Sequence, residues 1–85
     1  MASYKLLIKR SAAKELEELV PKVRRRIAPR IEALGIEPRP PGSEKLSGQE
    51  KYRIRQGDYR VLYAIDDGAQ TVTVVKIGHR REVYR

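Results

Sequence analysis

The chain has 85 residues, and its 19 lysines and arginines outnumber 11 acidic residues to give a formal net charge of +8. A chain of this length forms one domain, and the excess of positive charge favours a polyanionic partner such as nucleic acid. The sequence contains no cysteine and one histidine, which excludes disulfides, thiolate catalysis and thiolate-ligated zinc.

The opening residues, Met-Ala-Ser-Tyr-Lys, lead into no apolar stretch of the kind that signal peptides and transmembrane helices require. We therefore expect a soluble cytoplasmic protein with a single domain over residues 1–85. A domain this small has no room for a large substrate cavity. Any active site is expected on an open face, with a substrate larger than the protein itself.

A strand and two helices are expected in the first part of the chain. Residues 4–8 are typical of a short strand, and apolar residues then recur at helical spacing over residues 12–20 and 23–34. Ser11 is expected to cap the first helix, because its hydroxyl can accept a hydrogen bond from a free amide of the first turn. The two helices are expected to form an antiparallel hairpin.

Two prolines and a glycine mark the second helix. Pro21 suits its first position, and Gly35 is expected to end it. Pro29 falls inside the helix, where a proline removes one backbone hydrogen bond. We expect a kink at Pro29, or two shorter helical segments.

Three strands are expected after a loop rich in proline and glycine at residues 35–50. The strands cover residues 51–55, 59–66 and 71–79. Gly57-Asp58 and Asp67-Gly68 are expected to form two-residue hairpin turns. The sequence thus predicts an α+β domain, with an N-terminal strand and a helical hairpin packed on a mainly antiparallel four-stranded sheet.

Cationic and apolar residues alternate in the first of these three strands. Lys51, Arg53 and Arg55 alternate with Tyr52 and Ile54, so the cations share one face of the strand. A strand face that simply meets solvent would show the same pattern.

The expected position of Arg60 opposite Arg55 supports the hypothesis of a phosphate site on this face. A two-residue turn at Gly57-Asp58 would place Arg55 directly opposite Arg60. Like charges in that position are unfavourable, but a bound anion relieves the repulsion. We therefore predict that Arg53, Arg55 and Arg60 share one face of the sheet. The inference depends on the register, because a three-residue turn would put Arg55 and Arg60 on opposite faces.

A second cluster begins at the end of the last expected strand and consists of His79, Arg80, Arg81, Tyr84 and Arg85. RNA cleavage by the 2′-hydroxyl needs a proton acceptor, cations for the charge that develops on phosphorus, and an acid for the departing 5′-oxygen. The cluster suits this chemistry, although a disordered basic tail would contain the same residues. In the second helix, Arg24 and Arg25 either face solvent or contact RNA phosphates.

Several segments resemble the RelE/ParE toxin superfamily in their order and spacing, and in particular its RelE branch. The segments are Leu46-Ser47-Gly48, Tyr52-Arg53-Ile54-Arg55, residues 57–63 and residues 75–84. The resemblance implies a toxin and mRNA interferase that enters the ribosomal A site, cleaves messenger RNA there without a metal or cofactor, and so inhibits translation. It also implies neutralisation by a RelB-like antitoxin, and a heterotetramer of toxin and antitoxin is one expected assembly.

The resemblance also implies roles for individual residues. Arg53 and Arg55 match paired basic positions of the family, and Arg60 matches an arginine that binds the scissile phosphate. Arg80 matches an arginine that assists the leaving group. Tyr84 matches a tyrosine that stacks on a base and orients the 2′-hydroxyl. The expected catalytic residues are Arg55, Arg60, His79, Arg80 and Tyr84. The expected RNA-binding residues are Lys51, Arg53, Arg81, Arg24 and Arg25.

The proton acceptor and the exact function stay open. Some relatives carry lysines at the positions of Arg53 and Arg55, and arginine is a poor general base. His79 and Lys51 are the candidates; His79 is slightly favoured because imidazole titrates near neutral pH, unless it only shapes the strand end. Two other functions fit the same sequence: a ParE-like inhibitor of DNA gyrase, and an RNA-binding module without activity.

Overall fold

The computed structural model describes residues 3–46 and 50–83. The elements are β1 (Lys5–Ile8), α1 (Arg10–Glu18), α2 (Pro21–Ala33), β2 (Glu44–Lys45), β3 (Lys51–Gln56), β4 (Tyr59–Asp66) and β5 (Thr71–His79). In this part of the chain, no helix is long and apolar enough to cross a membrane.

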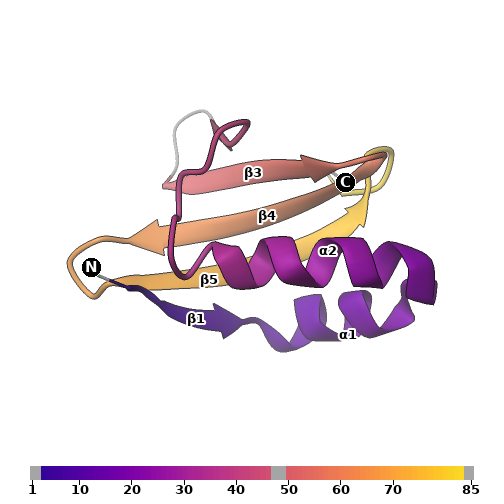
Figure 1. The fold of residues 1–85 in the computed structure, drawn as a ribbon, viewed down its shortest axis with the longest axis horizontal. Coiled ribbons are helices and arrows are strands. Elements are labelled where there is room, and N and C mark those ends of the chain that lie inside the picture. Colours follow the sequence, from indigo (N-terminus) through magenta and orange to yellow (C-terminus); the bar gives the residue numbers. More distant parts are fainter. Residues whose placement is uncertain (1–2, 47–49, 84–85) are drawn as a thin grey trace.

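The strands form one mixed sheet in the order β1-β5-β4-β3-β2 (Figure 1). β1 runs parallel to β5, and the other neighbouring pairs are antiparallel. Both helices pack on the same face of this sheet, because Ala12 of α1 and Ile27 and Ile31 of α2 join one buried cluster with Ile54 and Val61 of the central strands. The predicted α+β architecture is confirmed, and no helix of residues 3–46 and 50–83 lies on the other face of the sheet.

The sheet has five strands rather than the predicted four. The additional strand, β2, consists of Glu44 and Lys45, which pair with Arg53 and Tyr52 of β3. Two residues inside a loop rich in proline and glycine are too few to show the alternation that identifies a strand in a sequence. The consequence for the site is that β2 places Glu44 beside the basic strand.

The turn between β3 and β4 has the predicted length. Gln56 pairs with Tyr59, so Gly57 and Asp58 alone form the turn. Gly57 has a φ of 61°, a conformation that two-residue hairpin turns require and that glycine adopts at little cost. The turn therefore fixes the register that sets the arginines of β3 against those of β4.

The turn between β4 and β5 is longer than the predicted two residues. Asp66 pairs with Thr71, so residues 67–70 form the connection and the two-residue turn at Asp67-Gly68 was wrong. The carboxylate of Asp66 accepts a hydrogen bond from the N–H of Ala69 at 3.0 Å, and Gln70 takes a φ of 53°. A side-chain-closed turn of this kind is a common alternative where aspartate precedes a turn.

Pro21 marks the start of α2 as predicted, but Ser11 does not cap α1. α2 begins at Pro21, as predicted, and continues through Pro29 as one helix, so the expectation of two shorter segments was wrong. Ser11 lies inside α1, and the cap residue is Lys9, which has no side-chain cap bond. The N–H of Lys9 instead donates to the carbonyl of Val74 at 2.9 Å, which extends the pairing of β1 up to the helix.

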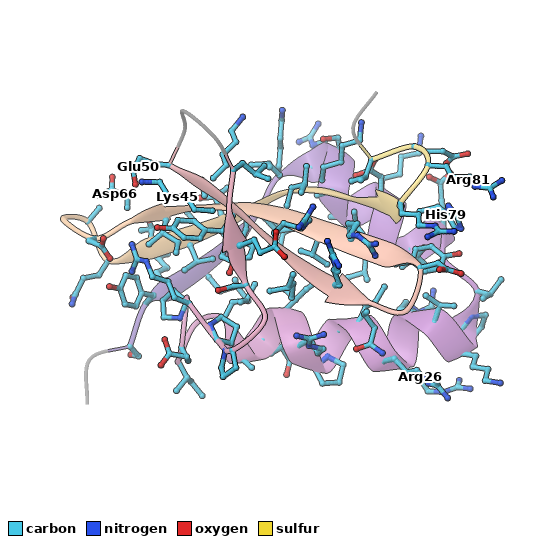
Figure 2. The ribbon with its side chains drawn as sticks, turned by 90° about the horizontal axis from the view of Figure 1, so that it is seen from above. Arg26, Lys45, Glu50, Asp66, His79 and Arg81 are labelled. Atoms are coloured by element: carbon cyan, nitrogen blue, oxygen red, sulfur yellow. The ribbon has the colours of Figure 1, made fainter. Side chains whose placement is uncertain are left out.

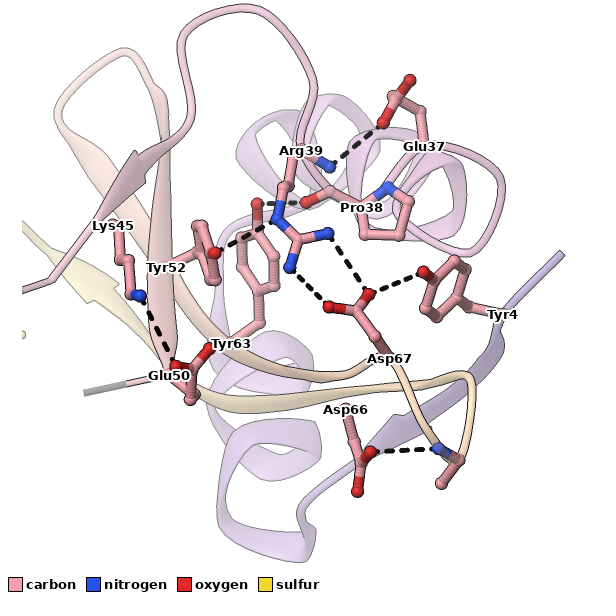
Figure 3. A network of polar contacts seen from close by, with 11 residues as sticks. Tyr4, Glu37, Pro38, Arg39, Lys45, Glu50, Tyr52, Tyr63, Asp66 and Asp67 are labelled. Atoms are coloured by element: carbon pink, nitrogen blue, oxygen red, sulfur yellow. Dashed lines mark hydrogen bonds and ion pairs between the residues drawn. The ribbon is translucent and has the colours of Figure 1, made fainter. Parts of the chain in front are cut away.

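A polar network joins the loop before β2 to the β4–β5 turn and to β3 (Figure 3). Arg39 donates to the carboxylate of Asp67 at 3.3 and 2.9 Å and to the hydroxyl of Tyr52 at 3.1 Å. The hydroxyl of Tyr4 donates to Asp67 at 2.7 Å. The hydrogen bonds from Arg39 and then from Tyr4 hold the pKa of Asp67 below its usual range. These charge-assisted bonds hold the loop that leads into β2 against the sheet.

Tyr63 lies fully buried in the core, and its hydroxyl donates to the carbonyl of Pro38 at 2.7 Å. Burial raises the pKa of Tyr63 to about 12. Because the folded state has the higher pKa, the stability that the neutral phenol contributes is fully present below pH 10 and is lost as the pH rises from 10 through 12.

We expect Tyr63→Phe to lower the free energy of unfolding by about 1–3 kcal/mol at pH 7, because the buried carbonyl of Pro38 loses its donor. At pH 11 the difference in unfolding free energy between wild type and variant should narrow by about 1 kcal/mol, since only the wild type has at position 63 a phenol whose pKa falls on unfolding. Urea titrations at both pH values measure the gap. Tyr59→Phe, at a half-buried tyrosine, is the control and should shift stability by less than about 0.5 kcal/mol. A gap that did not change with pH would contradict this account of Tyr63.

Candidate nucleic-acid interface

The sheet face turned away from α1 and α2, called the open face below, carries the arginines of β3 and β4. Tyr52 and Ile54 are buried on the helix side, so Arg53 and Arg55 project from the open face. Arg55 pairs directly with Arg60, and directly opposed residues of an antiparallel ladder project from the same face. The prediction that Arg53, Arg55 and Arg60 share one face is therefore confirmed.

Two lysines extend the basic surface of the open face. Lys51 begins β3, where the alternation puts it on the same face as Arg53, and it is exposed. Leu62 pairs with Arg53 on one side and with Lys76 of β5 on the other. Leu62 is only 9% exposed although no helix covers it, as expected where the long aliphatic stems of basic residues lie beside an apolar one. The open face thus combines Lys51, Arg53, Arg55, Arg60 and Lys76.

A β-bulge turns Lys76 toward the open face. Val75 is the extra residue, because Val74 and Lys76 pair with adjacent residues of β4. Unbroken alternation from the buried Val74 would turn Lys76 toward the helices and Ile77 outward. Ile77 is instead 2% exposed and belongs to the core. Sequence reasoning missed Lys76, because nothing in the strand's composition marks the bulge.

The β3–β4 turn brings Arg60 and Arg80 together. Arg60 Nη1 donates to the carbonyl oxygens of Gly57 and Tyr59, each at 3.1 Å. The N–H of Arg80 donates to the carbonyl of Asp58 at 2.7 Å, and Arg80 Nε lies 3.9 Å from Asp58 Oδ1. Within residues 3–46 and 50–83, no carboxylate pairs with Arg60. Among the described residues, its guanidinium group therefore contacts carbonyl oxygens and no carboxylate.

Glu44 of β2 lies among the arginines of β3. It pairs with Arg53 across the β2–β3 ladder, so its side chain projects from the open face. Its carboxylate forms ion pairs with Arg53 and, at 3.8 Å, with Arg55. The side chain of Arg53 is 15% exposed and that of Arg55 is 54% exposed. Sequence reasoning missed Glu44, since the short β2 that aligns it with Arg53 has no signature of its own.

His79 lies on the side of the sheet that the helices cover. It pairs with Tyr59, whereas Gly78 pairs with Arg60, so the imidazole and Arg60 project from opposite faces. The ring stands edge-on to Tyr59 with centroids 5.7 Å apart, and Nδ1 accepts the N–H of Arg81 at 3.2 Å. It lines a cavity of about 500 Å³ together with glutamates of α1. The structure therefore does not bring His79 together with the arginines of the open face.

The remaining predicted residues are dispersed. Arg24 and Arg25 belong to α2, on the helix side, and Arg24 donates to the carbonyl of Glu17 at 3.0 Å. Arg81 is exposed beyond the end of β5; Figure 2 shows it with His79 at the end of the sheet away from Asp66 and Glu50. Tyr84 lies outside the described residues, so its predicted stacking role remains a prediction.

The open face can hold an extended anion by fixed positive charge. Arginine presents a planar fork of donors that matches two oxygens of a phosphate, and it stays charged at all working pH values. No group of three or more histidine and acidic side chains in the described part of the chain is placed to hold a metal ion. The arrangement is suited to binding phosphates and to stabilising negative charge that develops on one of them.

Comparison with known structures gives the class of fold. The archaeal RelE of a RelE–RelB complex from Pyrococcus horikoshii superimposes with a TM-score of 0.82 and 29% identity, over 95% of this chain and 99% of that one. The toxin of the intact Escherichia coli RelBE complex gives a TM-score of 0.79 and 28% identity, over 91% and 96% of the two chains. The protein therefore has the RelE-like α+β fold.

Sequence comparison gives the family. A family described as the ParE toxin of type II toxin-antitoxin system, parDE, matches residues 6–84. Toxin RelG of Mycobacterium tuberculosis is 44% identical over 34 residues, which are 40% of this chain and 39% of the length of RelG. The chain belongs to this ParE toxin family, within the RelE/ParE toxin superfamily.

Proposed function

We propose that this protein is the toxin of a RelBE-type toxin–antitoxin pair and cleaves messenger RNA in the ribosomal A site. The observation that carries the proposal is the shared open face of Arg53, Arg55 and Arg60, with Arg80 at the adjoining turn. Direct pairing of Arg55 with Arg60 is unfavourable without an anion that contacts both, and of these two arginines the carboxylate of Glu44 contacts only Arg55 in the described residues. A phosphate of the RNA backbone supplies that anion.

The proposed reaction is attack of a ribose 2′-oxygen on the adjacent phosphorus. The P–O5′ bond breaks, which leaves a 2′,3′-cyclic phosphate on one fragment and a 5′-hydroxyl on the other. Arg55 and Arg60 stabilise the charge that develops on the non-bridging oxygens, and Arg80 assists the departing 5′-oxygen, which takes up a proton from water to become the 5′-hydroxyl. Lys51 shares the open face with these arginines and is the candidate for accepting the 2′-hydroxyl proton.

We expect His79→Ala to leave the cleavage rate within about threefold of wild type and the pH–rate profile unchanged. The reason is that the imidazole packs against Tyr59 on the helix side of the sheet. Single-turnover rates on programmed ribosomes from pH 5 to pH 9 measure both quantities, with Lys51→Ala as the companion variant. Loss of an ionisation near pH 6.5 in His79→Ala alone would restore histidine as the base.

The proposed partner is a RelB-like antitoxin. The structural neighbours include toxins in complex with RelB from Pyrococcus horikoshii and Escherichia coli. A net charge of +8 suits a partner that is extended, acidic and ordered on binding. We propose that its acidic residues face Arg53, Arg55 or Arg60, or that it displaces the segment bearing Tyr84, in a complex that can assemble as a heterotetramer.

A second candidate is inhibition of DNA gyrase, which the match to the ParE family favours. Gyrase inhibition needs a protein-binding surface and makes no use of opposed arginines on an open face. The two functions separate in parallel assays of purified protein. One adds the protein to translating ribosomes and maps breaks in the message by primer extension, and the other measures gyrase supercoiling. Breaks at A-site codons support the ribonuclease, whereas intact message with blocked supercoiling supports the gyrase inhibitor.

A further inference from the structure

Glu44 lies where a phosphate of bound RNA would have to be. Its carboxylate contacts the guanidinium groups of Arg53 and Arg55, the latter at 3.8 Å. Carboxylates and phosphates present similar oxygen pairs to arginine and use the same donors. An RNA phosphate that binds to Arg53 and Arg55 therefore has to displace the carboxylate of Glu44.

We propose that Glu44 is an internal competing anion that determines which polyanions the open face binds. This inference rests on the proposed function, because it takes RNA phosphate as the ligand. A phosphate that reaches only Arg53 and Arg55 exchanges one anion for another. An RNA that also contacts Arg60, which no carboxylate neutralises in the described residues, gains a contact that Glu44 does not offer. Glu44 thus selects for ligands that present several phosphates at once.

The position of Glu44 makes this displacement feasible. Its side chain is 57% exposed and belongs to a two-residue strand at the edge of the sheet. The ion pair with Arg55, whose side chain is 54% exposed, is open to water, and such pairs contribute little net energy, so a second anion can replace it. The backbone pairing of β2 with β3 nevertheless holds the carboxylate beside the arginines whenever no ligand is present.

A merely structural role for Glu44 predicts the opposite effect of its removal. If the carboxylate served only to hold the arginines in place, its loss would free their side chains and weaken anion binding. If the carboxylate competes with the ligand, its loss tightens binding. The direction of the change in affinity therefore decides between the two roles.

The experiment measures binding separately from cleavage. The probe is a fluorescent 12-nucleotide single-stranded RNA with 2′-O-methyl riboses, which lack the nucleophile, and affinity is read by anisotropy between 50 and 200 mM salt. We expect Glu44→Gln to tighten binding about fivefold at low salt. The slope of log affinity against log salt should steepen by about 0.7, the value of one added phosphate contact.

Matched variants separate the effect of the position of Glu44 on RNA affinity from the effect of the change in net charge. Glu50→Gln changes the net charge equally, but Glu50 pairs at 3.4 Å with Lys45, whose ladder partner Tyr52 is buried on the helix side. It should tighten binding less than twofold. Glu44→Asp keeps the charge but withdraws the carboxylate by one methylene, and it should give an intermediate gain. Thermal unfolding of each variant checks that the fold is retained.

Two results would overturn the proposal: equal affinities of Glu44→Gln and Glu50→Gln, or weaker binding by Glu44→Gln. Failure of every form, wild type included, to bind the free RNA would not bear on cleavage in the ribosomal A site, which the assay on translating ribosomes tests separately. In that case a calorimetric titration with inorganic pyrophosphate still tests Glu44. Tighter pyrophosphate binding by Glu44→Gln than by Glu50→Gln supports the competing role, and no difference between them refutes it.

Discussion

A message held in the ribosomal A site should be cleaved at least about 10⁵-fold faster than the same RNA free in solution. The open face supplies cations for the phosphate, but it is the exposed side of a sheet and does not enclose the ribose. The cavity of about 500 Å³ beside His79 lies on the helix side and so cannot hold the scissile phosphate against Arg60. We therefore expect the in-line arrangement of the 2′-oxygen, phosphorus and 5′-oxygen to come from the ribosome.

Single-turnover cleavage of one end-labelled message, free and bound to ribosomes with a vacant A site, measures this ratio. The control uses ribosomes whose A site is filled by transfer RNA, which should protect the message. Similar rates on free and bound message would show that the protein aligns the RNA alone. The proposal that the protein supplies the cations and the ribosome aligns the RNA would then be wrong.

Arg60→Ala should lower the single-turnover rate on ribosomes by about 10²- to 10³-fold, the usual cost of losing one strong donor to a developing oxyanion. Arg60 has no carboxylate partner in the described residues, and its neighbour Arg55 is partly neutralised by Glu44. Among Arg53, Arg55 and Arg60 it is therefore the arginine whose donors no carboxylate of the described residues occupies. Arg60→Lys should recover only part of the rate, because an ammonium group cannot present the planar fork.

The free energy of unfolding of Arg60→Ala shows whether a lost rate reflects the loss of a catalytic group or an unfolded protein. Removal of Arg60 relieves its repulsion with Arg55 across the ladder, so the free energy of unfolding should stay level or rise slightly. Arg10→Ala, an exposed position at the start of α1, is the matched control and should cleave at the wild-type rate. A wild-type cleavage rate in Arg60→Ala would show that the scissile phosphate does not bind at the β3–β4 hairpin.

The sequence by itself determined the hairpin that carries the arginines. Gly57-Asp58 admits a tight two-residue turn, and the alternation of apolar and basic residues in β3 assigns each residue to a face. These are local signals, because turn chemistry and period-two patterning depend on neighbours in the chain. They were enough to predict the opposition of Arg55 and Arg60 and the face shared by three arginines, and with the helical spacing of apolar residues over residues 12–20 and 23–34 they predicted the α+β fold.

Only the tertiary structure decided which other groups join that face. Glu44 reaches Arg53 and Arg55 through a two-residue strand, and Lys76 turns outward because the bulge at Val75 shifts the alternation of β5. The same pairing puts His79 on the helix side, away from Arg60. Register and bulges are set by packing between segments distant in sequence, such as β5 against α1, and one slipped residue reverses the face of every side chain that follows. The sequence therefore showed that positive charge gathers on the open face. Long-range packing decided that Glu44 neutralises part of this charge and that His79, a candidate base, projects from the other face.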